Sequence, residues 1–541
     1  MATTQTRPAQ TRDEPVRWAP GELAARIASR IPGSALLGWL GPIAVTLVAG
    51  VLRFWNLGNP HSIIFDETYY AKDSLSLLQY GVEHEYADKA EVVDKLLLGG
   101  NTDIFKENAS FIVHPQVGKW MIAIGYLLVA FAKTTLQGEA FDWQAGVTPV
   151  GWRLSAAIVG TLAILVVART ARRMTRSTML GCLAGLLLCL DGLEFVQSRI
   201  ALLDIFLMFW ILAAFACLVA DRDRARRRLA RLVEERGADL MGPFLGIRGW
   251  RIAAGVCLGL ALGTKWTAIW YIAAFGLLTF FWDVGARRAA GIKRPFLAAL
   301  KLDSPLAVVS IVVVSASVYV ASWWSWFASD DGWDRNWTDE SRFGVPAIVR
   351  NWWHYHVEIY NFHTGLTSHH DYQSSPWGWL LLARPVAYFY ESPPGCGADN
   401  CSTAITGIGT PAIWWAAIPV ILGMLWLWFA RRDWRASAVL VGVVVGIAPW
   451  LQYPDRTMFF FYALPALPFI VLALTVAAGW ALGPQPPPGQ PASNRRVGGA
   501  IAAGAYVLLV AANFLYFLPI WTAQLITYAS WGARMWLRTW I

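Results

Sequence analysis

The chain has 541 residues, of which 56% are hydrophobic and only 15% are charged, and it contains 31 Trp and 26 Phe. This composition excludes an ordinary soluble globular domain and indicates a polytopic membrane protein. The net charge is +9, and Arg residues cluster in short blocks between apolar runs. In a membrane protein such blocks set topology and contact anionic lipids. We therefore expect membrane lipids, and no nucleic acid, as partners.

The predicted fold is all-α, with eleven transmembrane helices in one domain over residues 35–518. Residues 1–34 are polar and contain Arg and Pro, so we expect them to form a disordered cytoplasmic arm. Apolar runs of spanning length, or close to it, then follow one another along the chain. They cover residues 35–52, 151–168, 178–193, 201–220, 250–264, 266–282, 305–325, 408–430, 436–453, 458–480 and 497–518.

Basic residues are distributed unevenly among the loops. Five loop segments are rich in Arg: "ARTARRMTRS", "DRDRARRRLARLVEERG", "GARRAAGIKR", "ARRDWR" and "NRR". The positive-inside rule places all five in the cytoplasm, and eleven spans with a cytoplasmic N-terminus satisfy this placement. A further apolar run, residues 117–133, would invert every later loop if it crossed the membrane. We therefore predict that it is an interfacial helix at the outer face.

Two long loops then lie outside, over residues 53–150 and 326–407, and the first is expected to contain juxtamembrane helices. The second holds Cys396 and Cys401 in the polar sequence "PPGCGADNCS". These cysteines are close enough in the chain to be bridged, and a disulfide requires an oxidising compartment outside the cytoplasm. The Trp-rich segment 519–541 follows the last span. We predict that it lies on the outer face as an amphipathic helix.

Two adjacent acids, Asp66 and Glu67, follow the first span in the sequence "PHSIIFDETYY". They are typical of solvated loop acids or of caps for the amphipathic stretch that follows. Further ionisable residues are predicted at the same face, namely His114, Lys119, Arg153, Arg199, Asp204 and Lys265. Each alone is typical of a snorkelling charge, but charges at membrane depth are costly unless they are paired or face a wet cavity. Together they predict a cationic pocket beside a carboxylate pair, which suits a lipid-linked phosphate donor and a hydroxyl acceptor.

The loop "HYHVEIYNFHTGLTSHHDYQ" carries many potential zinc ligands. They are His354, His356, His363, His369, His370 and Asp371. Their spacing matches no compact ligand pattern, so we expect no metal site. Trp377, in "SSPWGWL", is expected to form a wall of the donor or acceptor groove, because Trp favours membrane interfaces and can pack on sugar faces.

Seven motifs occur along the chain in a recognisable order. They are "FDETYY", "HPQVGKW", "WRLSAAIVGTL", "SRIALLD", "GTKWTAIW", "SSPWGWL" and "YPDRTMFFFYALPALPF". In order and approximate spacing, over about residues 50–475, the chain resembles the protein O-mannosyltransferases of the glycosyltransferase C superfamily. It is similar to bacterial, and more narrowly actinobacterial, members, because the long external loop has no inserted β-trefoil domain.

The resemblance implies a polyprenyl-phosphate mannose donor and Ser or Thr hydroxyls of exported proteins as acceptors. It also implies inversion at the anomeric carbon and a reaction that needs no cofactor. It implies catalysis at the outer face of the cytoplasmic membrane, with Asp66 as the base that takes the hydroxyl proton and Glu67 positioning the acceptor or supporting Asp66. Fixed positive charge would stabilise the leaving phosphate without a metal. The expected donor-phosphate ligands are Lys265, Arg199, His114 and Lys119, and the expected supporting or structural residues are Arg153, Asp204, Trp377 and Arg456.

Two other functions fit part of the pattern. A related lipid-sugar transferase would use the same donor chemistry to modify glycolipids. A transporter of polyprenyl-linked sugars would line its path with buried charges, but it should show inverted repeats with paired broken helices, and none is visible in this sequence. A carboxylate pair in a long external loop also favours chemistry at the membrane surface over passage across it.

Overall fold

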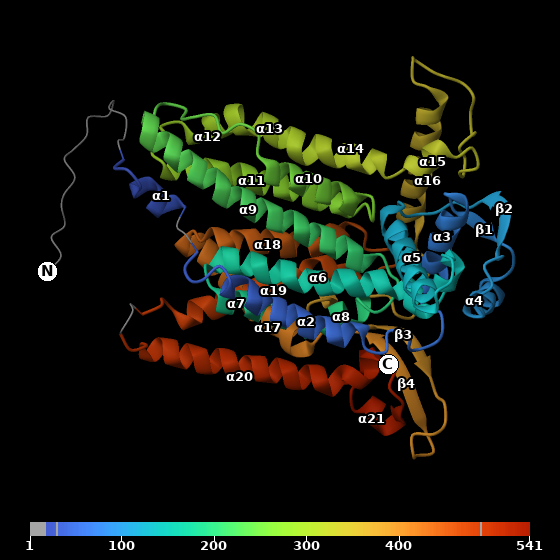
Figure 1. Cartoon of the computed structure of the whole chain (residues 1–541). Coiled ribbons are helices and arrows are strands. Elements are labelled where there is room, and N and C mark those ends of the chain that lie inside the picture. Colours follow the sequence, from blue (N-terminus) through green and yellow to red (C-terminus); the bar gives the residue numbers. More distant parts are fainter. Residues whose placement is uncertain (1–17, 29–30, 487–489) are drawn as a thin grey trace.

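The computed structural model describes residues 18–28, 31–486 and 490–541. Most of its helices run side by side along one axis, and the short strands gather at one end of this bundle (Figure 1). Within the described residues, ten helices are long and apolar enough to cross a membrane. They are α2 (Leu37–Phe54), α5 (Val117–Gln137), α6 (Pro149–Thr175), α9 (Asp204–Arg236), α11 (Ala268–Ala289), the α12 to α14 rod (Pro295–Ala321), α17 (Pro411–Arg431), α18 with its 3-10 extension (Trp434–Gln452), α19 with its preceding 3-10 turn (Phe460–Leu482) and the α20 segment (Asn494–Trp521).

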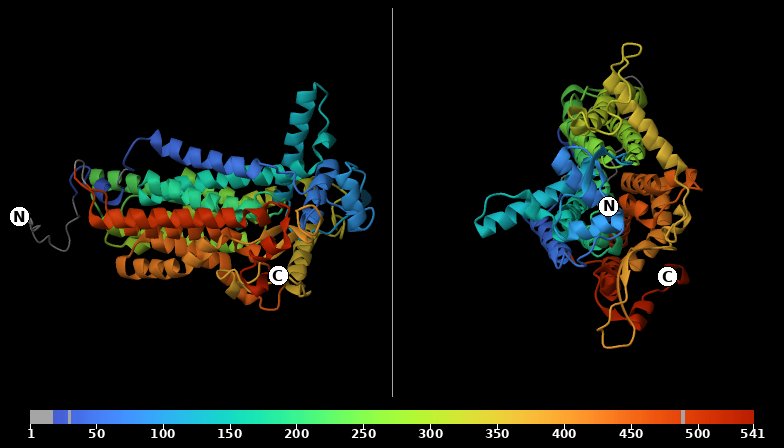
Figure 2. Two further views of the ribbon diagram at one scale, coloured as in Figure 1. Left: turned by 90° about the horizontal axis from the view of Figure 1, so that it is seen from below. Right: turned by 90° about the vertical axis from the view of Figure 1, so that its right-hand side faces the viewer.

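Helix α5 differs from the others in direction. It lies across the end of the bundle, at right angles to the long helices (Figure 2), as predicted for an interfacial helix. The crossing with α6 is close because two glycines meet there: a Cβ on Gly125 would lie 2.4 Å from the carbonyl oxygen of Gly151. Beyond this crossing α5 exposes Leu128, Phe131 and Leu136.

Two shorter apolar helices run within the bundle. Helix α7 (Thr178–Cys189) packs along α6, and α10 (Gly249–Leu262) packs along α9. Removing α5 from the ten candidates and adding α7 and α10 gives the eleven parallel segments that were predicted. Because successive segments reverse direction, the Arg-rich turns after α6, α9, α11, α17 and α19 all fall at the end of the bundle opposite the strands (Figure 1).

The Arg-rich end is more ordered than the sequence predicted. The segment expected as a loop after residue 220 continues α9 as a helix as far as Arg236. Residues 1–17 and 29–30 of the predicted disordered arm lie outside the described residues. Residues Glu22–Ile27, however, form helix α1, which buries Leu23 and Ile27 against α9. Their spacing of four residues places both on one face of α1, and this face packs against apolar side chains of α9.

The opposite end holds the two long loops. The first contains α3 (Glu67–Tyr80), α4 (Ala90–Leu98), and the antiparallel pair of β1 (His84–Tyr86) and β2 (Phe105–Ala109), so the predicted helices are present. The second contains α15 (Trp324–Ala328), α16 (Ala347–Gly365), β3 (Val386–Glu391) and β4 (Cys401–Gly407). Between β3 and β4, a Cys396–Cys401 disulfide confirms the predicted bridge.

The C-terminal segment is not the amphipathic helix that was predicted. It forms short elements, of which β5 (Ile526–Thr527) extends the sheet by pairing with β4, and α21 (Tyr528–Gly532) is the longest helix. Trp540 is buried, and its indole N–H donates to the carbonyl oxygen of Leu382 at 2.6 Å. Strand pairing and buried indoles give these backbone and aromatic groups partners that an isolated surface helix would not provide.

Candidate active site

Asp66 lies immediately before the first residue of α3 and faces the outer loops. Its neighbour Phe65 adopts the left-handed conformation, with φ of 49°, which is uncommon for a residue with a side chain. The Phe65 ring packs edge-on against Tyr388 and Phe461, with centroid separations of 5.1 and 5.9 Å. This aromatic anchor fixes the turn that carries Asp66. Among the described residues, no hydrogen bond or ion pair involves the Asp66 carboxylate.

Glu67 has the opposite environment. It is fully buried, and both of its carboxylate oxygens accept hydrogen bonds from the Arg153 guanidinium at 2.8 Å. The backbone N–H groups of Ala201 and Ile64 also donate to this carboxylate, at 3.0 and 3.2 Å. Arg153 in turn donates to the carbonyl oxygen of Pro60 at 2.9 Å. Glu67 and Arg153 therefore join α3, α6 and the preceding loop, and both carboxylate oxygens of Glu67 are occupied by this buried network.

A cavity of about 250 Å³ lies between α11, α16 and the turns around residues 449–462. Asp66 is not part of its lining, but it interacts electrostatically with Lys265 and Asp204, which both line the cavity. The Lys265 ammonium donates to the Asp204 carboxylate at 2.7 Å. The same ammonium lies 5.5 Å from the centre of the Tyr462 ring. The cavity wall is mainly aromatic, with contributions from Trp266, Trp270, Tyr360, Trp450, Tyr453 and Tyr462.

Arg456 is the second cation of the cavity. Its guanidinium donates to the carbonyl oxygen of His363 at 3.0 Å and lies 3.4 Å from Nδ1 of the same residue. Nε2 of His363 is 2.9 Å from the carbonyl oxygen of Val113. Because a carbonyl can only accept, Nε2 carries the proton and Nδ1 is free to accept from Arg456. His114 also lines the cavity, with its ring centre 5.1 Å from that of His363.

The pKa of the Asp66 carboxyl group and the pKa values of the two imidazoles are shifted in opposite directions. Burial raises the pKa of Asp66 to about 7; the Lys265 ammonium opposes this shift, and the Asp204 carboxylate reinforces it. Burial, together with the charge of Lys265, lowers the pKa of His114 well below its usual value. Burial and then Arg456 lower the pKa of His363 to about 4. At neutral pH the site therefore contains two neutral imidazoles, two side-chain cations and a carboxyl group near its titration midpoint.

The structure brings together Asp66, Asp204, Lys265, His114 and Arg456, but it places three other predicted residues elsewhere. Arg199 donates to backbone carbonyl oxygens at the end of α2, including that of Trp55 at 2.7 Å, so it caps this helix and does not face a phosphate. Lys119 is fully buried, and its ammonium group forms an ion pair with the Glu83 carboxylate at 2.8 Å. Trp377 is 77% exposed and lies outside the cavity. Free helix-end carbonyls and buried acids attract basic side chains as strongly as a ligand does.

Several residues of the cavity escaped the sequence analysis. Phe65, Trp266, Trp270 and Trp450 were read only as apolar residues, and His363 only as one of many histidines. A partial signal was present for Trp266 and Trp270, because both lie in the motif "GTKWTAIW" that also contains Lys265. Nothing in the sequence shows that the end of α16, which carries His363, lies against Arg456.

The potential zinc ligands, which were not expected to form a metal site, are dispersed. His354 lies 3.1 Å from Asp334, Nε2 of His356 lies 2.6 Å from the Tyr319 hydroxyl, and the exposed His369 lies 3.7 Å from Asp371. Over residues 18–28, 31–486 and 490–541, no group of three or more His, Cys, Asp or Glu residues is placed to share a metal ion. These histidines therefore act as separate loop contacts.

Known proteins share both the sequence and the fold. Residues 82–289 match the family described as dolichyl-phosphate-mannose-protein mannosyltransferase, and residues 348–540 match the C-terminal four-transmembrane region of protein O-mannosyltransferase. A polyprenol-phosphate-mannose–protein mannosyltransferase of Mycobacterium tuberculosis is 37% identical over 539 residues, which is 96% of this chain and 95% of the relative. One of Corynebacterium glutamicum is also 37% identical, covering 92% of each chain.

The Pmt1-Pmt2 complex of Saccharomyces cerevisiae, solved bound to its sugar donor, superposes with a TM-score of 0.70 at 14% identity, covering 96% of this chain and 94% of that one. The chain thus shares a helical membrane fold with this complex, and its match to named mannosyltransferases shows that it is a glycosyltransferase. Within that class, the chain belongs to the protein mannosyltransferase family.

Proposed function

We propose that the protein transfers mannose from polyprenyl-phosphate mannose to Ser or Thr hydroxyls of exported proteins. The observation that carries this proposal is an unpaired carboxyl group, Asp66, beside a cavity with two side-chain cations. The names of the 37% identical relatives support the donor and a protein acceptor. The open position of Asp66 suits an acceptor that arrives from the outer loops.

In this mechanism Asp66 takes the proton of the acceptor hydroxyl as its oxygen forms a bond to the anomeric carbon. The bond between that carbon and the phosphate oxygen breaks, and the electron pair leaves with polyprenyl phosphate. Attack opposite the leaving group inverts the anomeric configuration. Lys265 and Arg456 stabilise the charge that grows on the leaving phosphate. The two cations carry the charge that a metal supplies in other transferases, so a chelator should leave transfer unchanged.

The test is to incubate the purified enzyme with polyprenyl-phosphate mannose and a Ser/Thr-rich peptide from an exported protein. Mass spectrometry should find hexose-sized increases on Ser or Thr, and a peptide with Ala at those positions should stay unmodified. Transfer to a lipid acceptor with none to the peptide would instead favour the glycolipid alternative. Movement of the donor across a vesicle membrane with no transfer would favour the transporter.

We further propose that the active site faces the outside of the cytoplasmic membrane. The positive-inside rule supports this orientation, because the Arg-rich turns lie at the end opposite Asp66. The disulfide in the β3–β4 hairpin at the same end of the bundle (Figure 1) supports it too, since such bonds persist in oxidising compartments. The test places a single cysteine at Glu107 in β2 or at Glu235 in α9, both of which are exposed. The cysteine at 107 should react with an impermeant thiol reagent in intact cells. The cysteine at 235 should react only after the membrane is permeabilised. Labelling of both from one side would refute the orientation.

A further inference from the structure

The Arg-rich end has a cavity of its own, larger than the one beside Asp66. It measures about 560 Å³ and lies between the end of α9 and the segment that leads into α10. Four arginines of α9 line it, at positions 224, 227, 228 and 231. Transfer chemistry at the opposite end of the bundle gives these residues no role.

The charge of these arginines is almost uncompensated. The nearby carboxylates are already engaged: Arg248 holds Asp221 at 2.6 Å and Asp283 at 2.9 Å, and Arg251 holds Asp283 at 2.7 Å. All four lining arginines of α9 are exposed. Among them, within the described residues, the one ion pair joins Arg231 to Glu235 at 3.9 Å, where both side chains are more than half exposed. Such a contact adds little.

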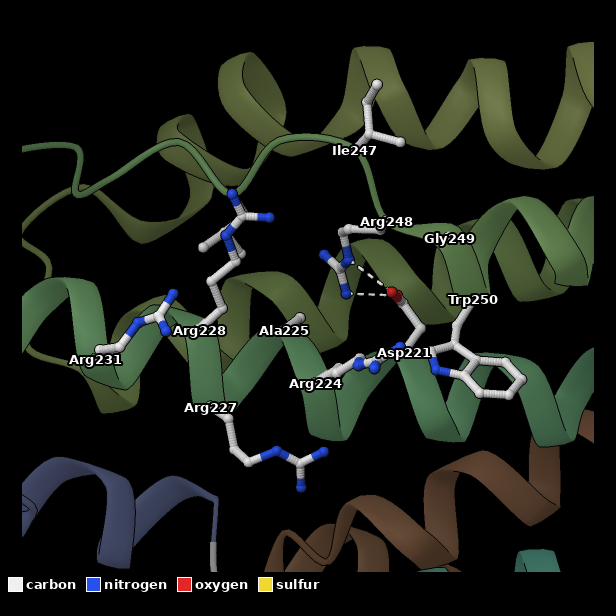
Figure 3. Close-up of a pocket in the computed structure, with 11 residues that line it drawn as sticks. Asp221, Arg224, Ala225, Arg227, Arg228, Arg231, Ile247, Arg248, Gly249 and Trp250 are labelled. Atoms are coloured by element: carbon white, nitrogen blue, oxygen red, sulfur yellow. Dashed lines mark hydrogen bonds and ion pairs between the residues drawn. The ribbon is translucent and has the colours of Figure 1, made fainter.

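The arrangement of the cavity favours a ligand that is anionic at one end and apolar at the other. Figure 3 shows Arg228 extending from α9 to the segment that carries Ile247, with Arg231 extending along α9 towards Arg228 and Arg248 turned onto Asp221. The Ile247 side chain points away from α9 in the same view. On this rim the side chains of Ile247 and Trp250 are 73% and 40% exposed. Trp favours the polar boundary of a bilayer, and α10 begins its apolar run directly after this rim.

We propose that this cavity binds the headgroup of an anionic phospholipid in the leaflet at the Arg-rich end. Arginine guanidinium groups would contact the phosphodiester oxygens in the forked geometry that favours Arg for phosphate. Ile247 and Trp250 would lie along the glycerol and the first part of the acyl chains. An acidic protein or a nucleic acid would satisfy the arginines but leave this apolar rim without a partner. The site is independent of the transfer reaction.

The experiment measures lipid binding to the full-length enzyme after delipidation in detergent, by calorimetric titration. The probes are short-chain phosphatidylglycerol, phosphatidylcholine of the same chain length, and inorganic phosphate. The test variant is Arg228→Gln with Arg231→Gln. The matched control is Arg236→Gln with Arg288→Gln, which removes the same charge from exposed positions outside the cavity at the same end.

The wild type should bind phosphatidylglycerol more tightly than phosphatidylcholine. The cavity variant should lose affinity for it by about thirtyfold, since each basic residue near an anionic lipid contributes on the order of one kilocalorie per mole. The control should keep wild-type affinity. If the double variant does not fold, Arg231→Gln alone should lose about fivefold. Equal losses in cavity and control variants, or displacement of the lipid by inorganic phosphate at matched concentration, would overturn the proposal.

Discussion

The two ends of the bundle contain similar buried ion pairs but leave opposite charges free. At the outer-loop end Glu67 neutralises Arg153 and Glu83 neutralises Lys119. Within the described part of the chain, Asp66 keeps neither an ion pair nor a side-chain hydrogen bond. At the other end the nearby acids form ion pairs with Arg248 and Arg251, so the exposed arginines of α9 have almost no acidic partners. The comparison teaches that local charge density does not mark a site in this protein. What marks it is the group that pairing leaves free.

The largest effect is expected from Asp66→Asn, which keeps the side-chain shape but cannot accept a proton. Mannosyl transfer to peptide should fall by about 10²–10⁴-fold, the usual cost of losing a positioned base, while donor binding persists. Asp103→Asn, an exposed acid of the same loop, is the matched control and should transfer at the wild-type rate. Near-normal turnover of the Asp66 variant would return this residue to the role of a solvated cap.

Glu67→Gln should act on folding and not on the chemical step. It leaves the buried Arg153 guanidinium without its counter-charge, which typically costs about 3–5 kcal/mol of stability. Thermal unfolding in detergent should detect the loss, and Arg153→Gln in the same chain should recover part of it. A Glu67→Gln protein of normal stability that had lost turnover would show instead that Glu67 takes part in transfer.

The two cavity cations should affect the donor. Arg456→Gln removes a guanidinium that engages backbone carbonyls, the His363 imidazole and the rings of Trp450 and Tyr462. No acid is left unpaired, and loss of a charge-assisted contact should weaken donor binding by roughly 1.5–3 kcal/mol. Lys265→Ala should weaken donor binding at least as much, because this substitution also leaves the Asp204 carboxylate without its ion-pair partner. Donor affinity measured by titration separates these variants from Arg199→Gln, which should lower stability and leave donor affinity unchanged.

The smallest effect concerns pH. With its pKa raised to about 7, Asp66 is protonated below that value and cannot act as a base, so kcat/KM should fall about tenfold for each pH unit below the midpoint. Above this midpoint kcat/KM should become independent of pH. His363→Gln should keep the same midpoint, because the pKa of His363 is already lowered to about 4. A midpoint that moves with His363 would assign the titration to the imidazole.

The sequence by itself determined the membrane architecture, because spanning length, Arg distribution and the burial of apolar runs are local properties. It identified the eleven parallel segments, the direction of α5 and the disulfide, and it singled out the 66–67 pair as a candidate site. The basic residues were harder to assign. Lys119, Arg153, Arg199 and Lys265 look equivalent in a sequence, since each is a cation beside an apolar run.

Only the tertiary structure decided which of them is free to meet a ligand, because that depends on partners distant in the chain. Lys119 pairs with Glu83, Arg153 pairs with Glu67, and Arg199 caps the end of α2. Lys265, although it pairs with Asp204, lines the cavity together with Arg456. The C-terminal segment was misjudged for the same reason. Its amphipathic pattern predicts a helix, but pairing with β4 and burial of Trp540 against Leu382 satisfy its backbone and indoles through contacts that no local pattern records.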